Sequence, residues 1–151
     1  MRTLLAAALL ATSTMAAAAG LPYDELADAK ADIHAALTQA RSDQTPVLVV
    51  FGANWCGDCR MLDMAFKDGT AAPLIAKKFK VVKVDFGRFD RNVDVAETYG
   101  LSLKPGIPAV VVLSAEGKVV YSTRAGELAN ARKMGDSGIF DFFSKVASTT
   151  K

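Results

Sequence analysis

The feature that most constrains this chain is an apolar run that ends just before its two cysteines. The run covers Val47–Phe51, and Cys56 and Cys59 follow it after the short connection Gly52-Ala53-Asn54-Trp55. Leucine and methionine side chains recur with helical spacing after Cys59. We therefore predict a buried strand that ends near Phe51 and a helix that begins at Cys56.

The start of a helix is a position that activates sulfur. The unpaired N–H groups of the first helical turn carry partial positive charge, which favours a thiolate over a thiol and lowers the pKa of Cys56. The spacing places Cys59 about one turn further on and on the same face, within bonding reach of Cys56. We predict that Cys56 attacks a substrate disulfide and that Cys59 resolves the resulting mixed disulfide.

The first residues have the pattern of an export signal. Arg2 supplies a positive charge, Leu4–Ala11 are apolar, and Ala16–Ala19 offer the small side chains that a signal peptidase needs. We expect residues 1–19 to be removed as a signal peptide and residues 20–151 to form one periplasmic domain. A retained anchor is disfavoured because a membrane span needs roughly 20 apolar residues. We therefore expect no stable membrane insertion.

The charge of the chain does not identify a partner. The 151 residues carry a formal net charge of +2, with acidic and basic residues interspersed. This distribution gives no sign of a nucleic-acid or membrane surface, and we expect a soluble monomer that binds no nucleic acid. In an oxidising compartment the two cysteines could form a structural disulfide, but such bonds usually close longer loops.

Hydrophobic patterning predicts an α/β domain. Asp24 is expected to cap a first helix that carries Leu26 on its apolar face and runs to about Ser42. A strand–helix–strand unit with parallel strands follows, and then an antiparallel hairpin and a closing amphipathic helix. The predicted strands cover 47–51, 80–86, 107–113 and 119–122, and the predicted later helices cover 56–68, 73–79, 93–99 and 139–146.

Metal and haem sites are poor alternatives for the cysteine pair. Zinc usually needs four ligands. In addition to the two cysteines the chain has one histidine, His34, which is distant in the sequence and expected at the surface. Covalent haem attachment requires a histidine where this chain has Arg60. A copper(I) site with Met61 or Met64 stays open, although methionines at this spacing are more often core residues. We assign neither a metal nor a cofactor.

Several residues outside the cysteine pair bear on the site. Pro108 stands at the start of a predicted strand, where a cis peptide bond would expose the neighbouring backbone, but sequence leaves the isomer open. Trp55 would either shield the sulfurs and contact substrate, which we favour, or be a core aromatic residue. We expect Lys83 and Asp85, near the end of the adjacent strand, to be solvated charges rather than modulators of the thiols.

Together these motifs resemble the thioredoxin superfamily over nearly all of Thr45–Val146. The matching residues are Trp55-Cys56-Gly57-Asp58-Cys59, Lys83 on the next strand, and Tyr99-Gly100 before Gly106-Ile107-Pro108. The resemblance implies a thioredoxin-like three-layer fold with a central mixed sheet flanked by helices. The helix predicted after Asp24 would be an extra N-terminal element of that fold.

The resemblance also implies roles for individual residues. Cys56 and Cys59 would form a redox-active disulfide, Pro108 would be a cis-proline facing it, and Ile107 would offer its backbone to an extended substrate. With the export signal, the protein resembles a periplasmic thiol–disulfide oxidoreductase acting on protein disulfides, with electrons from an unidentified donor such as a membrane thiol reductase. The substrate-binding residues would be Trp55, Gly57, Asp58, Ile107 and Pro108.

Three positions depart from the family pattern. Cytosolic thioredoxins have a buried aspartate six residues before the first cysteine, whereas this chain has Val50. Asp58 replaces the proline common between the cysteines, and its charge and that of Arg60 would move a thiol pKa in opposite directions. The connection Leu101–Gly106 is longer than the thioredoxin norm and borders the loop of Pro108.

The direction of electron flow does not follow from these residues. A reductase or exchange enzyme is the leading hypothesis, but an oxidant or isomerase would use the same atoms. Direction depends on reduction potential, and a difference of ~30 mV changes this two-electron equilibrium tenfold. A non-catalytic module that binds copper or a peptide is the alternative from another functional class.

Overall fold

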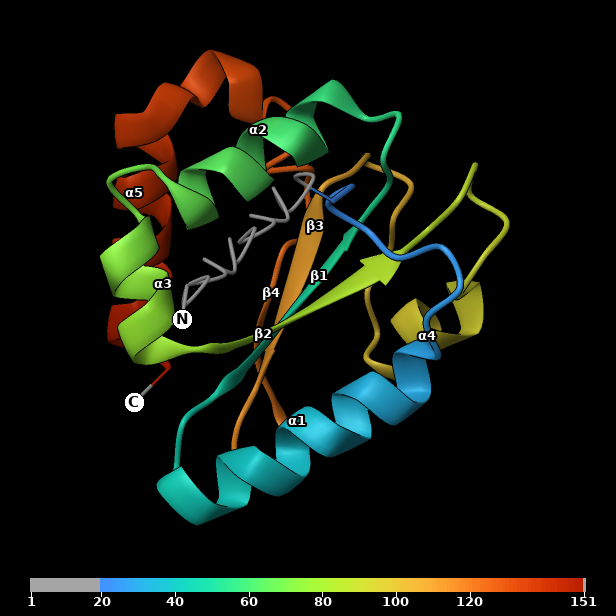
Figure 1. The fold of residues 1–151 in the computed structure, drawn as a ribbon, viewed down its shortest axis with the longest axis vertical. Coiled ribbons are helices and arrows are strands. Elements are labelled where there is room, and N and C mark those ends of the chain that lie inside the picture. The colour runs from blue at the N-terminus through green and yellow to red at the C-terminus, as the bar shows by residue number, and fades with distance from the viewer. Residues whose placement is uncertain (1–19, 151) are drawn as a thin grey trace, which may run out of the picture.

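The computed structural model describes residues 20–150, so the predicted signal peptide at 1–19 lies outside the described residues. Within that part, the strands form one sheet in the order β2-β1-β3-β4 (Figure 1). Strand β1 is parallel to β2 and antiparallel to β3, which is antiparallel to β4. The sheet is therefore mixed, as predicted. The strands are β1 (Val47–Gly52), β2 (Lys80–Asp85), β3 (Ala109–Leu113) and β4 (Val119–Ser122).

Helices cover both faces of the sheet and complete the predicted three-layer α/β fold. One core cluster joins the sheet to α1 and α4, and a second joins its other face to α2, α3 and α5 (Figure 1). The first of these helices, α1, is the extra N-terminal element that the sequence predicted. The helices are α1 (Ala29–Asp43), α2 (Gly57–Lys67), α3 (Ala72–Lys78), α4 (Val93–Thr98) and α5 (Ala131–Thr149).

Strand β1 is apolar throughout because it is a central strand that is covered on both faces. All six of its residues are buried. Successive side chains point to opposite faces, so Val49 and Phe51 pack in the cluster with α1, while Leu48 and Val50 pack with α2 and α5. This central strand delivers the chain directly to Cys56.

The first helix begins later than the sequence pattern predicted. Helix α1 is capped by Asp28, whose side chain accepts a hydrogen bond from the N–H of Ala31, so the residues from Asp24 onward do not form its first turn. Asp24 instead accepts a local hydrogen bond from the N–H of Leu26. Leu26 is 95% exposed rather than part of an apolar helix face.

Two further boundaries differ from the prediction. Strand β3 begins at Ala109 rather than at Ile107, because the intervening Pro108 cannot donate a ladder hydrogen bond. Helix α5 begins at Ala131, earlier than predicted, and is interrupted at Gly135, which has φ 66° and ψ −178°. Among residues 20–150, none of the helices combines the length and apolar character needed to cross a membrane.

Candidate active site

Cys56 stands at the junction between β1 and α2, as the sequence predicted. It is the N-cap residue of α2, and its Sγ accepts a hydrogen bond from the N–H of Cys59 at 3.1 Å. The two cysteines are joined by a disulfide, with their Cα atoms 5.2 Å apart. The first turn of α2 thus directs a backbone donor at the sulfur that was predicted to be the nucleophile.

The two cysteines differ in accessibility. Cys56 keeps 6% of its surface exposed, whereas Cys59 is fully buried. The carbonyl oxygen of Ile107 lies 3.7 Å from Cys56 Sγ, and the peptide bond between Ile107 and Pro108 is cis. The proline loop therefore lies against the cysteine that a second molecule can approach.

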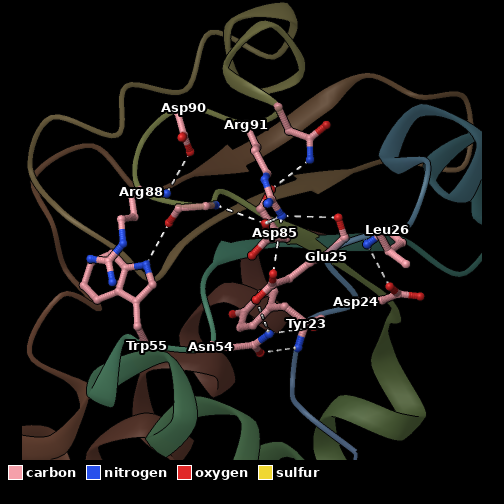
Figure 2. Close-up of polar contacts among 12 residues, drawn as sticks. Tyr23, Asp24, Glu25, Leu26, Asn54, Trp55, Asp85, Arg88, Asp90 and Arg91 are labelled. Carbon is pink, nitrogen blue, oxygen red and sulfur yellow. Dashed lines mark hydrogen bonds and ion pairs between the residues drawn. The ribbon is translucent and has the colours of Figure 1, made fainter.

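Trp55 lies at the surface beside this pair. Its side chain is 46% exposed, which excludes the core alternative. The indole Nε1 donates a hydrogen bond to the carbonyl of Gly87 at 2.8 Å, and the Arg88 guanidinium lies 5.7 Å from the ring centroid (Figure 2). The ring of Phe89 is 6.2 Å away. The loop after β2 thus supports an exposed aromatic surface next to the cysteines.

Asp58 is paired with Arg132 of α5. Its carboxylate accepts hydrogen bonds from the backbone N–H of Arg132 at 3.0 Å and from the guanidinium at 3.3 Å. Burial raises the pKa of Asp58, but the hydrogen bonds and charge of Arg132 outweigh it and hold that pKa below its ordinary value. Arg60, the partner considered from sequence, instead donates to the backbone oxygen of Asn54. At Gly57, also predicted to bind substrate, an added Cβ would stand 3.2 Å from the Arg132 guanidinium.

Lys83 is not a solvated charge, contrary to the sequence-based expectation. It pairs with Asp63, which lies on α2 one turn after Cys59 and is only 7% exposed. Lys67 also approaches the Asp63 carboxylate, at 2.8 Å. Burial raises the pKa of Asp63, but hydrogen bonds from Lys67 and Lys83 outweigh it and lower the pKa. The structure thus holds a buried carboxylate on α2, although Val50 leaves none on β1.

Asp85 is also buried, because local donors compensate its charge. Its carboxylate accepts hydrogen bonds from Arg91 at 3.2 Å and from the N–H of Gly87 at 3.1 Å (Figure 2). Asn92 donates to its backbone oxygen. The expectation of a solvated charge was wrong here, because the loop after β2 folds back over the strand end.

Tyr23 is a neighbour of the cysteine pair that the sequence analysis missed. It is 2% exposed and lies beside Cys59, in the space that Gly52 leaves at the end of β1. The signal that could have revealed this contact is Gly52 itself. A glycine at the end of an apolar strand often marks the close approach of another segment.

A hollow of about 530 Å³ is lined by Phe89 of the loop after β2 and by Leu101 and Leu103 of the connection that precedes Pro108. On α2, the Met64 side chain is 62% exposed. Over residues 20–150, no group of three or more histidine, cysteine or acidic side chains has the arrangement of a metal site.

Comparisons with known proteins agree with this geometry. A family model described as thioredoxin-like matches residues 28–115. The crystal structure of a disulphide isomerase from Xylella fastidiosa Temecula1 is 53% identical, with a TM-score of 0.82 over 85% of this chain and 98% of that chain. Thioredoxin 1 of Nostoc sp. is 39% identical over 74 residues, which cover 49% of this chain and 62% of that protein. Thioredoxin of Bacillus subtilis is 32% identical over 84 residues, 56% of this chain and 72% of that protein.

The fold and the cysteine pair at the start of α2 define the class of thioredoxin-like domains with a Cys-X-X-Cys disulfide. The chain belongs to the thioredoxin-like family. It spans less than two thirds of the length of the Nostoc relative.

Proposed function

We propose that the protein is an exported, periplasmic thiol–disulfide oxidoreductase that reduces or exchanges protein disulfides through Cys56 and Cys59. The observation that carries this proposal is the position of Cys56. Its sulfur caps α2 and accepts a helix N–H, and it is bonded to a buried partner. Such a position stabilises a thiolate at the more accessible cysteine of the pair.

The reaction would begin from the reduced pair. The Cys56 thiolate attacks one sulfur of a client disulfide, forming a mixed disulfide and releasing the other client sulfur as a thiolate. Cys59 then loses its proton and attacks Cys56 Sγ, so that the Cys56–client bond breaks and the second client thiolate leaves. Two electrons pass from the cysteine pair to the client. The backbone oxygen of Ile107 lies 3.7 Å from the sulfur that the client must reach, and the exposed Trp55 immediately precedes Cys56 in the chain.

The second candidate is an isomerase or oxidant. The Xylella relative is named a disulphide isomerase, and this name supports the second candidate. Equilibrating the purified protein with glutathione decides between a reductase and an oxidant. A potential well below that of glutathione is expected for a reductase, whereas a potential well above it would contradict the reductase and favour the oxidant.

Trapping in cells tests the attack by Cys56. In Cys59→Ser the mixed disulfide cannot be resolved, so we expect client proteins to remain linked to Cys56 and to be released by dithiothreitol. The matched control is Cys56→Ser, which should trap nothing. Equal trapping by both variants would contradict the assignment of Cys56 as the nucleophile.

Turnover separates an enzyme from a binding module. We expect the protein to accelerate the reduction of insulin by dithiothreitol. An unaltered rate, together with no trapped client, would favour the module that binds copper or a peptide. Because Cys59→Ser has no disulfide for a donor to reduce, the electron donor, for example a membrane thiol reductase, would be sought with the unaltered protein, as the partner that converts its Cys56–Cys59 disulfide to thiols.

The proposed location rests on the signal pattern of residues 1–19. Cell fractionation and N-terminal sequencing test it. We expect the protein in the periplasmic fraction with Gly20 as its first residue, and an unprocessed chain in the cytoplasm would contradict export.

A further inference from the structure

The Tyr23 phenol and the Cys59 sulfur occupy the same small space. Both Tyr23 Oη and Cys59 Sγ lie within 3.0 Å of the point where a Cβ on Gly52 would stand. Tyr23 is 2% exposed and Cys59 is fully buried. The phenol of a residue far upstream in the chain is therefore next to the sulfur that the proposed reaction must activate.

The backbone of Tyr23 is fixed to the loop that carries Cys56. The N–H of Tyr23 donates to Asn54 Oδ1 at 2.9 Å, and Asn54 Nδ2 donates to the carbonyl of Tyr23 at 2.9 Å (Figure 2). Asn54 Nδ2 also reaches the side chain of Glu25 at 3.2 Å. These contacts fix the backbone of Tyr23, and with it the phenol, to the loop that precedes Cys56.

The phenol is kept protonated by its surroundings. Burial and the nearby carboxylates of Asp63 and Asp85 raise the pKa of Tyr23. Lysines pair with Asp63, and Arg91 pairs with Asp85. Tyr23 therefore offers an O–H donor at any pH at which cysteines react. A negatively charged group at the same position would instead repel a thiolate.

We propose that the Tyr23 hydroxyl is an active-site donor that stabilises Cys59 as a thiolate while the mixed disulfide is resolved. This inference rests on the proposed function. In the step concerned, Cys59 gives its proton to solvent, its Sγ receives a hydrogen bond from Tyr23, and a bond forms between Cys59 Sγ and Cys56 Sγ. The bond from Cys56 to the client sulfur breaks, and its electron pair leaves with the client thiolate.

The test uses the coloured probe 5,5′-dithiobis(2-nitrobenzoate) on the reduced protein. Cys56 first forms a mixed disulfide with the aryl thiol, and attack by Cys59 then releases the aryl thiolate in a second phase. In Tyr23→Phe we expect this second phase to be about tenfold slower near neutral pH, because a hydrogen bond to a charged group is lost. The pH midpoint of the phase should rise by about one unit.

Tyr121→Phe is the matched control. Tyr121 lies on the edge strand β4 and packs against Phe142, away from the cysteines. Tyr121→Phe therefore removes the same phenol oxygen at a position that does not contact them. Its second phase should equal that of the unaltered protein. Equal second phases and equal pH midpoints in Tyr23→Phe and Tyr121→Phe would overturn the proposal.

A second measurement covers the case in which Tyr23→Phe unfolds, and the first phase of the probe reaction separates this proposal from the proposed function. In the unaltered protein, the NMR signal of the Tyr23 Cζ atom should shift upon reduction and follow the titration of Cys59, and a signal insensitive to reduction would overturn the proposal even if Tyr23→Phe unfolds. If the probe forms no mixed disulfide at Cys56 in the unaltered protein, the proposed function itself fails. A normal first phase with an unaffected second phase refutes only the role of Tyr23.

Discussion

At the scale of single residues, the Asp63 carboxylate is a buried charge whose stability in the fold depends on its partners. Lys83 and Lys67 both contact it. Asp63→Asn removes the negative charge and leaves both lysines without the carboxylate that compensates them. We expect the free energy of unfolding near neutral pH to fall by about 2 kcal/mol, measured by urea denaturation.

The pH dependence of that loss has a defined sign. The pKa of Asp63 is lower in the folded protein than its ordinary value of 3.8, so its stabilising contribution is complete above 3.8 and is lost as pH falls through the lowered value. The stability gap between the unaltered protein and Asp63→Asn should therefore narrow in acid. Asp141→Asn, at an exposed position of α5, should show no gap, and an Asp63→Asn gap that stays constant with pH would contradict the argument.

Arg132 should control the electrostatic environment of Cys56 through Asp58. Arg132→Ala removes the cation that compensates the Asp58 carboxylate in the first turn of α2. The uncompensated carboxylate disfavours a nearby thiolate, so we expect the pKa of Cys56 to rise by about half a unit or less, as suits an exposed ion pair. Alkylation rates across pH, in the Cys59→Ser background, measure this.

Lys133 provides the control for that experiment. It is exposed and one residue further along α5, so Lys133→Ala removes the same charge without removing a bond to Asp58. A rise in the Cys56 pKa that is equal in both variants would show a general charge effect rather than the specific pair.

At the scale of elements, the end of β1 depends on the absence of a side chain at Gly52. A Cβ there would stand closer to the Tyr23 phenol than real Cβ atoms approach, and 3.0 Å from Cys59 Sγ. Gly52→Ala should lower the free energy of unfolding by about 2 kcal/mol, because a packed core must shift to admit the methyl group. Thermal or urea denaturation measures the loss.

Gly20→Ala adds the same methyl group where no atom lies within 4 Å. We expect that control to be as stable as the unaltered protein. If Gly52→Ala is equally stable, the contact between Tyr23 and the end of β1 is not as close as described.

At the scale of the whole molecule, Asn54 joins the N-terminal segment to the body of the domain. Its side-chain amide makes two hydrogen bonds with the backbone of Tyr23, and its backbone carbonyl accepts one from Arg60 of α2. Asn54→Ala should release the segment, so the Tyr23 amide should exchange with solvent at least tenfold faster. Asn130→Ala, at an exposed position without a side-chain cap bond, should leave that exchange unchanged. Slow exchange in Asn54→Ala would show that other contacts hold the segment.

The elements could be predicted because each depends on a local pattern. A central strand covered on both faces needs an unbroken apolar run, and Val47–Phe51 is one. The proximity of Cys56 and Cys59 could be predicted equally well, because residues three apart at the start of a helix are neighbours regardless of the tertiary fold. The predicted start of the first helix failed because Asp24 and Asp28 are both suitable caps, and local pattern does not choose between them.

The rest of the site depends on segments that are distant in the sequence. Asp58 meets Arg132, Asp63 meets Lys83, and Tyr23 meets Cys59 only after the layers have packed. Periodicity identifies which face of an element is buried but not which residue of another element lies opposite. The charge of Lys83 was therefore read as solvated, although a buried carboxylate on the neighbouring helix compensates it.

The clamped position of Tyr23 has a practical consequence for recombinant work. An affinity tag joined ahead of Gly20 would leave the domain a few residues from the sulfur atoms, where it could hinder a client or bring foreign nucleophiles close to them. Thr150 lies near Thr45 and Pro46, at the opposite end of β1 from the cysteines. A strand of this length spans about 20 Å. A purification handle or a surface-immobilisation linker is therefore better attached behind α5.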